Sequence, residues 1–190
     1  AALVAIRRPV PSEDLVHGGS PSRPNRMWCA DVTQHRTGQC WLYLAVVLDC
    51  FSRRVVGWAM VDHLRAEIVV DALQMALWQR RPGPGTIHHA DHCAQYTSWA
   101  FGHRLRGAGL LGSMASVGDV DNSVAESFFA TLQTELLDRS SWATRTELAS
   151  AIFAFIEAFY NPRRRHSTCG YLSPADYEAA AAGRLTNAAA

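Results

Sequence analysis

The chain has 190 residues, of which 48% are apolar, and a formal net charge of only +1. This length suits one globular domain with a substantial core and is short for two. The near-neutral charge excludes a global field that would drive the protein onto nucleic acid or a membrane, so the distribution of charge matters more than its sum.

The sequence also argues against a membrane span and a disulfide framework. Its longest apolar run, "CWLYLAVVLDCF", meets Asp49 after about nine residues, whereas a spanning helix needs about 20. The five cysteines are scattered, and no CxxC pair occurs. This usage is typical of reduced thiols in an intracellular protein and not of a structural zinc site.

The first half of the chain predicts a lead-in followed by strands. Residues 1–24 contain the Gly/Ser/Pro-rich run "HGGSPSRPN" and are expected to form a flexible linker. Three short stretches rich in aromatic and β-branched residues then follow, over 26–33, 40–51 and 53–61. Their short separations favour hairpin turns, so we expect an antiparallel meander packed under helices.

The second half alternates helices with short strands. Apolar spacing predicts a helix over 65–80, and "TIHHA" predicts a strand that ends at Asp91. Further predicted elements are a helix over 97–107, a strand over about 110–115, a loop over 116–122 and a helix over about 123–137. A last helix begins at the cap Thr144, carries an apolar stripe through Phe155 and Phe159, and ends at Pro162. The expected fold is therefore an α/β sheet of mixed direction.

Three carboxylates occupy informative positions on this map. Asp31 lies within the first predicted strand, Asp91 at the end of the fourth, and Glu126 in the first turn of a helix. An acid inside a buried strand is costly unless something positive pairs with it. Carboxylate oxygens favour Mg²⁺ or Mn²⁺, and two such ions about 3.5 to 4 Å apart are suited to phosphoryl transfer.

The residues alone leave other interpretations open. Glu126 has a structural explanation as the capping-box partner of Ser123. The stretch "IHHADHCAQYTS" also suggests a soft metal site or a cysteine nucleophile with a histidine base, using His88, His89, His92 and Cys93. Zinc, however, would need a spaced second pair of ligands, which the sequence does not offer.

Five blocks in order carry a family resemblance: "MWCADVT", "WLYLAVVLDCFSRRVVGWAM", "HHADHCAQYTS", "DNSVAESFFATLQTEL" and "YNPRRRHSTCGYLSPADYE". They resemble the catalytic core of bacterial insertion-sequence transposases of the DDE, retroviral-integrase-like superfamily, specifically the second-frame (OrfB-type) protein. The similarity spans roughly Asn25 to Tyr177. It implies a ribonuclease-H-like mixed five-stranded sheet with helices on both faces, with the core over 25–182 and an Ala-rich tail over 183–190.

The resemblance also implies roles for particular residues. Asp31, Asp91 and Glu126 would be the catalytic triad that binds two Mg²⁺ or Mn²⁺ ions, for DNA cleavage and strand transfer without a covalent protein intermediate. The expected DNA contacts are Gln95, Asn122, Gln133, Arg163, Arg164 and Arg165. The expected partners are element ends, target DNA, further copies of the chain and a separate or upstream helix-turn-helix part. The expected location is the bacterial cytoplasm, at the nucleoid when active.

Several departures from the family pattern favour a second hypothesis. The 34 residues between Asp91 and Glu126 are one fewer than the family usually has. Gln133 stands where Lys or Arg is usual, and Cys169 where Leu is usual. The alternative is therefore a catalytically impaired remnant that folds and binds DNA or a partner. A ribonuclease-H-type nuclease would share the fold and the acids, but the "YNPRRRHS" segment favours the transposase.

Overall fold

A five-stranded sheet forms the centre of the protein, in the order β3-β2-β1-β4-β5. The computed structural model describes residues 21–91, 93–114 and 123–188. The strands are β1 (Met27–Arg36), β2 (Trp41–Asp49), β3 (Val55–Val61), β4 (Ile87–Ala90) and β5 (Leu111–Met114). Strands β1 to β3 pair antiparallel, and β4 and β5 continue the sheet in parallel with β1. The predicted meander and the mixed direction of the sheet are confirmed.

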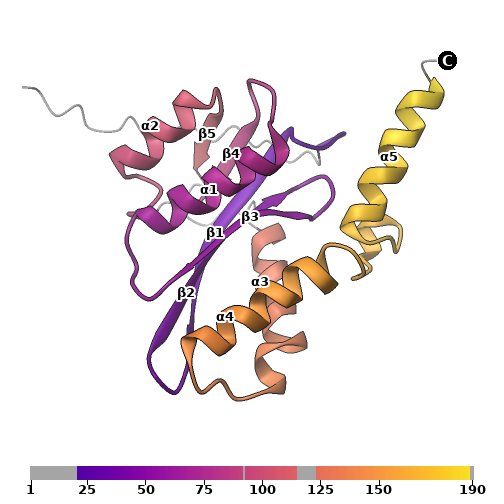
Figure 1. Cartoon of the computed structure of the whole chain (residues 1–190). Helices are drawn as coiled ribbons and strands as arrows, with labels where there is room; N and C mark the ends of the chain where they lie inside the picture. The colour runs from indigo at the N-terminus through magenta and orange to yellow at the C-terminus, as the bar shows by residue number, and fades with distance from the viewer. Residues whose placement is uncertain (1–20, 92, 115–122, 189–190) are drawn as a thin grey trace, which may run out of the picture.

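Helices cover both faces of the sheet, with α1 (Glu67–Arg80) and α2 (Trp99–Gly107) on one side. The other side carries α3 (Ser123–Glu135) and α4 (Arg145–Ala154) (Figure 1). Alternation along the strands explains the two layers, because successive side chains point to opposite faces. On β2, Ala45 and Val47 pack in the core under α1, whereas Leu44 and Val46 pack under α3 and α4.

Gly57 on β3 lets α1 approach the sheet closely. A Cβ atom there would lie 2.2 Å from the carbonyl oxygen of Ala72 on α1. No side chain fits at that distance, so glycine is required by the close approach of helix and strand.

The helix predicted to run from Thr144 to Pro162 changes character part-way. Thr144 caps it as expected, accepting a 3.1 Å bond from the Glu147 amide, and α4 then passes into a π-helical turn, η3 (Phe155–Tyr160). The wider turn brings residues five apart onto one face. Tyr160 therefore takes the buried place predicted for Phe159, which is 40% exposed.

The last helix, α5 (Pro174–Ala188), follows the short 3-10 turn η4 (Ser167–Cys169) and projects away from the sheet (Figure 1). It runs through the boundary predicted at residues 182 and 183, because its alanines are strong helix formers and continue the helix. Over the described residues, no helix is both long and apolar enough to cross a bilayer.

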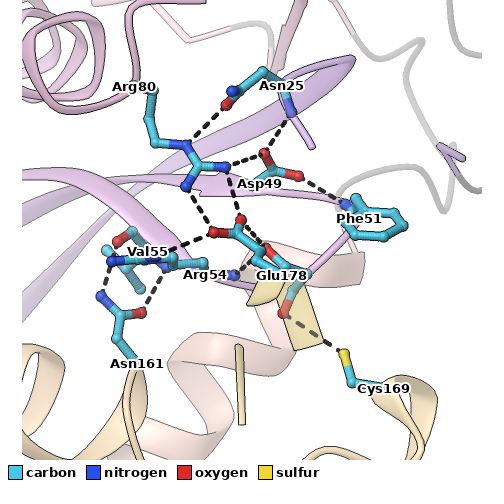
Figure 2. A network of polar contacts seen from close by, with 10 residues as sticks. Asn25, Asp49, Phe51, Arg54, Val55, Arg80, Asn161, Cys169 and Glu178 are labelled. Atoms are coloured by element: carbon cyan, nitrogen blue, oxygen red, sulfur yellow. Dashed lines mark hydrogen bonds and ion pairs between the residues drawn. The ribbon is translucent and has the colours of Figure 1, made fainter. Parts of the chain in front are cut away.

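A buried ionic network fastens α5 to the body of the protein (Figure 2). Both carboxylate oxygens of Glu178 accept 2.7 Å bonds from Arg80 at the end of α1, and Arg80 also bonds Asp49 at 3.2 Å. Ser52 and Arg54, from the turn between β2 and β3, complete the bonds to Glu178. Burial acts to raise the pKa of Glu178, but the bonds and charge of Arg80 outweigh it, and the pKa is lowered.

Candidate functional site

Two of the three predicted carboxylates follow paired residues on neighbouring parallel strands. Ala30 of β1 pairs with Ala90 of β4, and the next residue on each strand is an aspartate, Asp31 or Asp91. Parallel neighbours lie about 4.8 Å apart, so these two backbone positions are adjacent. The alternation of side chains along β1 assigns Asp31 to the face opposite Ala30, which is the face that α3 covers, and Asp91 follows Ala90 directly after the end of β4.

Glu126 comes from the helix that packs over this face. It lies in the first turn of α3, between Ala125 and Ser127. Ala125 and Phe128 are completely buried in the core that includes Cys29 of β1, and this packing fixes the start of α3 against the sheet. The Glu126 side chain is exposed. The fold thus brings residues 31, 91 and 126 to one end of the sheet.

The electrostatics of Asp31 reflect the two other acids. The pKa of Asp31 is raised to about 6: burial is the largest cause, the negative charges of Asp91 and Glu126 add to it, and a 2.7 Å bond from the Val32 amide opposes it. Like charges that interact through a partly desolvated space favour a bound cation. The oxygen donors fit a hard divalent ion in their chemistry.

The geometry is nevertheless that of an open site. Among the described residues, no group of three or more His, Cys, Asp or Glu side chains is gathered closely enough to hold an ion. Asp91 and Glu126 are both exposed, so packing does not lock their rotamers as it does that of a core side chain. A closed ligand set would require these two side chains to turn toward Asp31.

The two described histidines of the "IHHADHC" stretch, His88 and His89, do not come together as the soft metal site considered from the sequence. His88 and His89 are consecutive residues of β4 and therefore point to opposite faces of the sheet. His88 packs against Phe101 at 5.2 Å between ring centroids, and His89 Nδ1 lies 3.0 Å from Ser113 Oγ. His92 lies outside the described residues. These contacts give His88 and His89 roles in packing.

Of the six residues predicted to contact DNA, three are exposed, two are half-buried and one lies outside the described residues. Gln95 is half-buried in the turn after β4, whereas its neighbour Tyr96 is 3% exposed and belongs to the core. Gln133 is exposed on α3 and hydrogen-bonds Asp138. Asn122 lies outside the described residues. No contact in the described residues tests whether Gln95 and Gln133 bind DNA, so both assignments stay predictions.

The arginines after η3 differ from one another. Arg163 and Arg165 are exposed. Arg164 instead bonds Glu135 through Nε and Nη2, at 3.0 and 2.9 Å, and its guanidinium lies over the Tyr160 ring. Much of the bonding capacity of Arg164 is thus used inside the protein, which leaves Arg163 and Arg165 as the better candidates for phosphate contact.

Comparison with known families identifies the fold that carries this site. Residues 21–119 match the model of the Integrase core domain, and residues 126–181 match a second model of the same description. The chain belongs to the integrase core domain family. The second match begins at Glu126.

Similar integrase cores occur in curated transposases. The chain is 43% identical over 158 residues to the transposase InsF for insertion sequence IS3A of Escherichia coli (strain K12), covering 83% of this chain and 55% of the relative. It is 41% identical over 156 residues to the transposase for insertion sequence element IS904 of Lactococcus lactis subsp. lactis (strain IL1403), covering 82% and 62%. The chain therefore spans little more than half the length of these relatives.

Solved retroviral integrase cores share the fold. The HTLV-2 integrase catalytic core domain in complex with magnesium (trimeric form) aligns with a TM-score of 0.62 at 16% identity, covering 83% of this chain and 98% of that one. A chain of the simian T-cell lymphotropic virus intasome in complex with PP2A regulatory subunit B56 gamma aligns with a TM-score of 0.67, also at 16% identity, covering 92% of this chain and 62% of that one. The predicted ribonuclease-H-like fold is confirmed.

The sequence analysis did not single out one basic residue next to this integrase-core site. Arg53, in the turn between β2 and β3, donates a 3.1 Å bond from Nη1 to Ser127 Oγ, one residue past Glu126 on α3. The pair is 74 residues apart in sequence. The only sequence signal was the basic pair "RR" at positions 53 and 54, which local patterns do not connect to α3.

Proposed function

We propose that this chain is the catalytic core of an insertion-sequence transposase, which cleaves DNA at element ends and joins the freed 3′-hydroxyl to target DNA. The observation that supports the proposal is the placement of residues 31, 91 and 126 at one end of the sheet, where burial and the charges of Asp91 and Glu126 raise the pKa of Asp31. The family and the transposase relatives support the same class of reaction.

In this proposal, Asp31, Asp91 and Glu126 bind two divalent cations, Mg²⁺ or Mn²⁺. Such ions would activate the attacking oxygen and stabilise the leaving one. Asp31 contributes a carboxylate held by its own strand and by the Val32 amide. Asp91 and Glu126 contribute exposed carboxylates that can turn toward substrate and ion. The protein acts by positioning and charge neutralisation.

The partners in this proposal are the element ends, the target DNA and further copies of the chain bound to the same DNA. In this proposal, recognition of the end sequence falls to a helix-turn-helix part, separate or upstream. The proposed place of action is the bacterial cytoplasm.

Metal binding can be tested apart from catalysis. Titration of Mn²⁺ into the chain by isothermal calorimetry should give binding that Asp91→Asn weakens, because one hard oxygen ligand becomes an amide. Glu67→Gln, on α1 at the opposite face of the sheet, is a matched control and should leave the isotherm unchanged. Binding unaffected by Asp91→Asn would remove Asp91 from the site.

Catalysis can be tested with pre-cut element ends in a strand-joining assay. Glu126→Gln keeps the shape of the side chain but removes its charge and replaces a hard oxygen ligand with an amide, so joining should fall by about 100-fold or more. Glu67→Gln should join at the wild-type rate. Joining by Glu126→Gln at the wild-type rate would exclude Glu126 from catalysis. An inert wild-type chain that still binds DNA would instead favour an impaired remnant.

A further inference from the structure

A basic hollow lies beside α3, on the same side of the sheet as the candidate site. It measures about 440 Å³ and is formed by three segments: the turn between β2 and β3, the first half of α3, and the loop after η3. Its lining includes Arg53, Ser127, Arg164, Arg165 and Ser167. Among the described residues that line it, none is acidic.

The charge in this hollow is only partly neutralised. Arg164 is paired with Glu135 at 2.9 Å. Arg53 bonds the neutral hydroxyl of Ser127, and Arg165 is exposed. The pKa of His166 in the same wall is lowered to about 4, mainly by burial and also by the positive charges of Arg164 and Arg53, which the charge of Glu135 opposes. The hollow is therefore suited to an anion.

The donors in the hollow match the oxygens of a phosphate group. The Arg53 guanidinium donates one bond to Ser127 Oγ, and a guanidinium has further N–H groups for an anion. Because Ser127 accepts that bond, its hydroxyl hydrogen remains able to donate outward. Arginine forks and hydroxyls are the usual partners of phosphate oxygens in protein–DNA interfaces.

The walls of the hollow are held in place before any ligand arrives. The loop after η3 is closed by bonds from the His166 amide to the Leu172 carbonyl and from the Tyr171 amide to the His166 carbonyl, at 3.1 and 2.9 Å. Arg164 anchors the same loop to Glu135 of α3. Preorganised donors bind more tightly because less ordering is lost on binding.

The backbone is also unusual at this hollow. Arg53 has φ 63° and Tyr171 has φ 61°, and both residues line it. Side chains larger than glycine are strained in this left-handed region. An arginine kept there in place of glycine points to a use for its side chain beyond the turn itself.

We propose that this hollow binds a phosphate group of the DNA backbone, with Arg53 and Arg165 as cationic contacts and Ser127 as a hydroxyl donor. Ser127 is one residue from Glu126, about 100° further round the helix, so the bound phosphate neighbours the reacting one and fixes the register of the strand. The assignment to DNA rests on the proposed function, whereas affinity for a phosphate group does not.

The test measures duplex DNA binding by fluorescence anisotropy at several salt concentrations, with a chelator present so that catalysis plays no part. Arg53→Gly and Arg165→Gln should each weaken binding about 3- to 10-fold for every sequence and lower the salt-dependence slope by about one. Arg65→Gln, an exposed arginine just before α1, is the matched control and should change neither.

Arg53→Gly separates function from folding, because glycine suits a φ of 63°. This variant should melt at the wild-type temperature or above it and still lose affinity. If the wild-type chain binds DNA and both variants show the wild-type affinity and salt-dependence slope, the proposal is overturned. If Arg53→Gly loses both DNA affinity and melting temperature, Arg165→Gln decides. Loss of affinity at the wild-type melting temperature in Arg165→Gln would support the proposal, and any other result for that variant would overturn it.

Inorganic phosphate, titrated by NMR, distinguishes a free anion from the DNA backbone. The proposal is supported if phosphate changes the NMR chemical shifts of the wild type, if Arg53→Gly abolishes these changes, and if the same variant alters the salt-dependence slope of DNA binding. The same shifts with an unaltered DNA slope would overturn the assignment to DNA. A chain that fails to join DNA but shows the altered slope would refute the catalytic proposal and leave this one standing.

Discussion

His88 shows how a single buried residue ties stability to pH. Its side chain is only 2% exposed and packs against Tyr96 and Phe101. Burial lowers its pKa to about 4, a bond to its own backbone opposes the shift, and His89 adds to it. An unfolded histidine titrates near pH 6.5. Between about pH 6.5 and 4 the unfolded chain therefore binds more protons than the folded one.

Stability should consequently fall as the pH falls through this window, and the His88 contribution should decrease by about 2 kcal/mol between pH 7 and 5. His88→Phe keeps an aromatic ring and removes the proton site. The free energy of unfolding should be measured with urea at both pH values. The difference between His88→Phe and the wild type should shift by about 2 kcal/mol in favour of the variant when the pH is lowered from 7 to 5. His103→Gln, at an exposed histidine, is the control and should show the same dependence of stability on pH as the wild type. A stability difference between His88→Phe and the wild type that is the same at pH 5 and pH 7 would contradict the role of His88.

Among the helices, α5 depends on an ionic network for its attachment to the rest of the protein, and this dependence can be tested. Glu178 is the α5 member of the network with Arg80 and Asp49, and the Glu178 and Arg80 side chains are each only 12% exposed. Glu178→Gln removes an anionic partner of both Arg80 and Arg54 and leaves Arg80 with only the 3.2 Å pair to Asp49, so the variant should lower the free energy of unfolding by about 2 to 4 kcal/mol. Limited proteolysis should also cut α5 faster in this variant.

Glu157→Gln is the matched control for that experiment, because Glu157 is an exposed residue that bonds Trp58 at the surface. Its effect should stay below about 0.5 kcal/mol. Equal stability of Glu178→Gln and the wild type would mean that α5 is held by its apolar contacts alone.

The elements also show what local patterns can and cannot predict. Aromatic and β-branched composition predicted β1, and the short run "TIHHA" predicted β4, and with them the positions of Asp31 and Asp91, because strand composition is a local property. The burial of Tyr160 in place of Phe159 was not predicted, because apolar spacing does not indicate a π-helical turn. The bond between Glu178 and Arg80 was missed for a different reason: the residues are 98 positions apart, and only the tertiary fold joins them.

For the whole molecule, the net charge of +1 means that DNA binding has to depend on a few local cations. Gln133 lies two helical turns beyond Glu126 on α3, on the same side of the helix. Gln133→Lys adds one positive charge there. We expect this variant to bind duplex DNA several-fold more tightly at low salt, with a salt-dependence slope larger by about one.

Gln74→Lys makes the same change of charge on α1, at the opposite face of the sheet, where Gln74 is exposed. If the DNA crosses the face formed by α3, only Gln133→Lys should alter the slope, because a charge on the far side lies beyond the Debye length of about 10 Å at 0.1 M salt. Equal effects of the two variants would mean that binding follows total charge. DNA would then have no preferred face, and the proposed path beside Glu126 would be wrong.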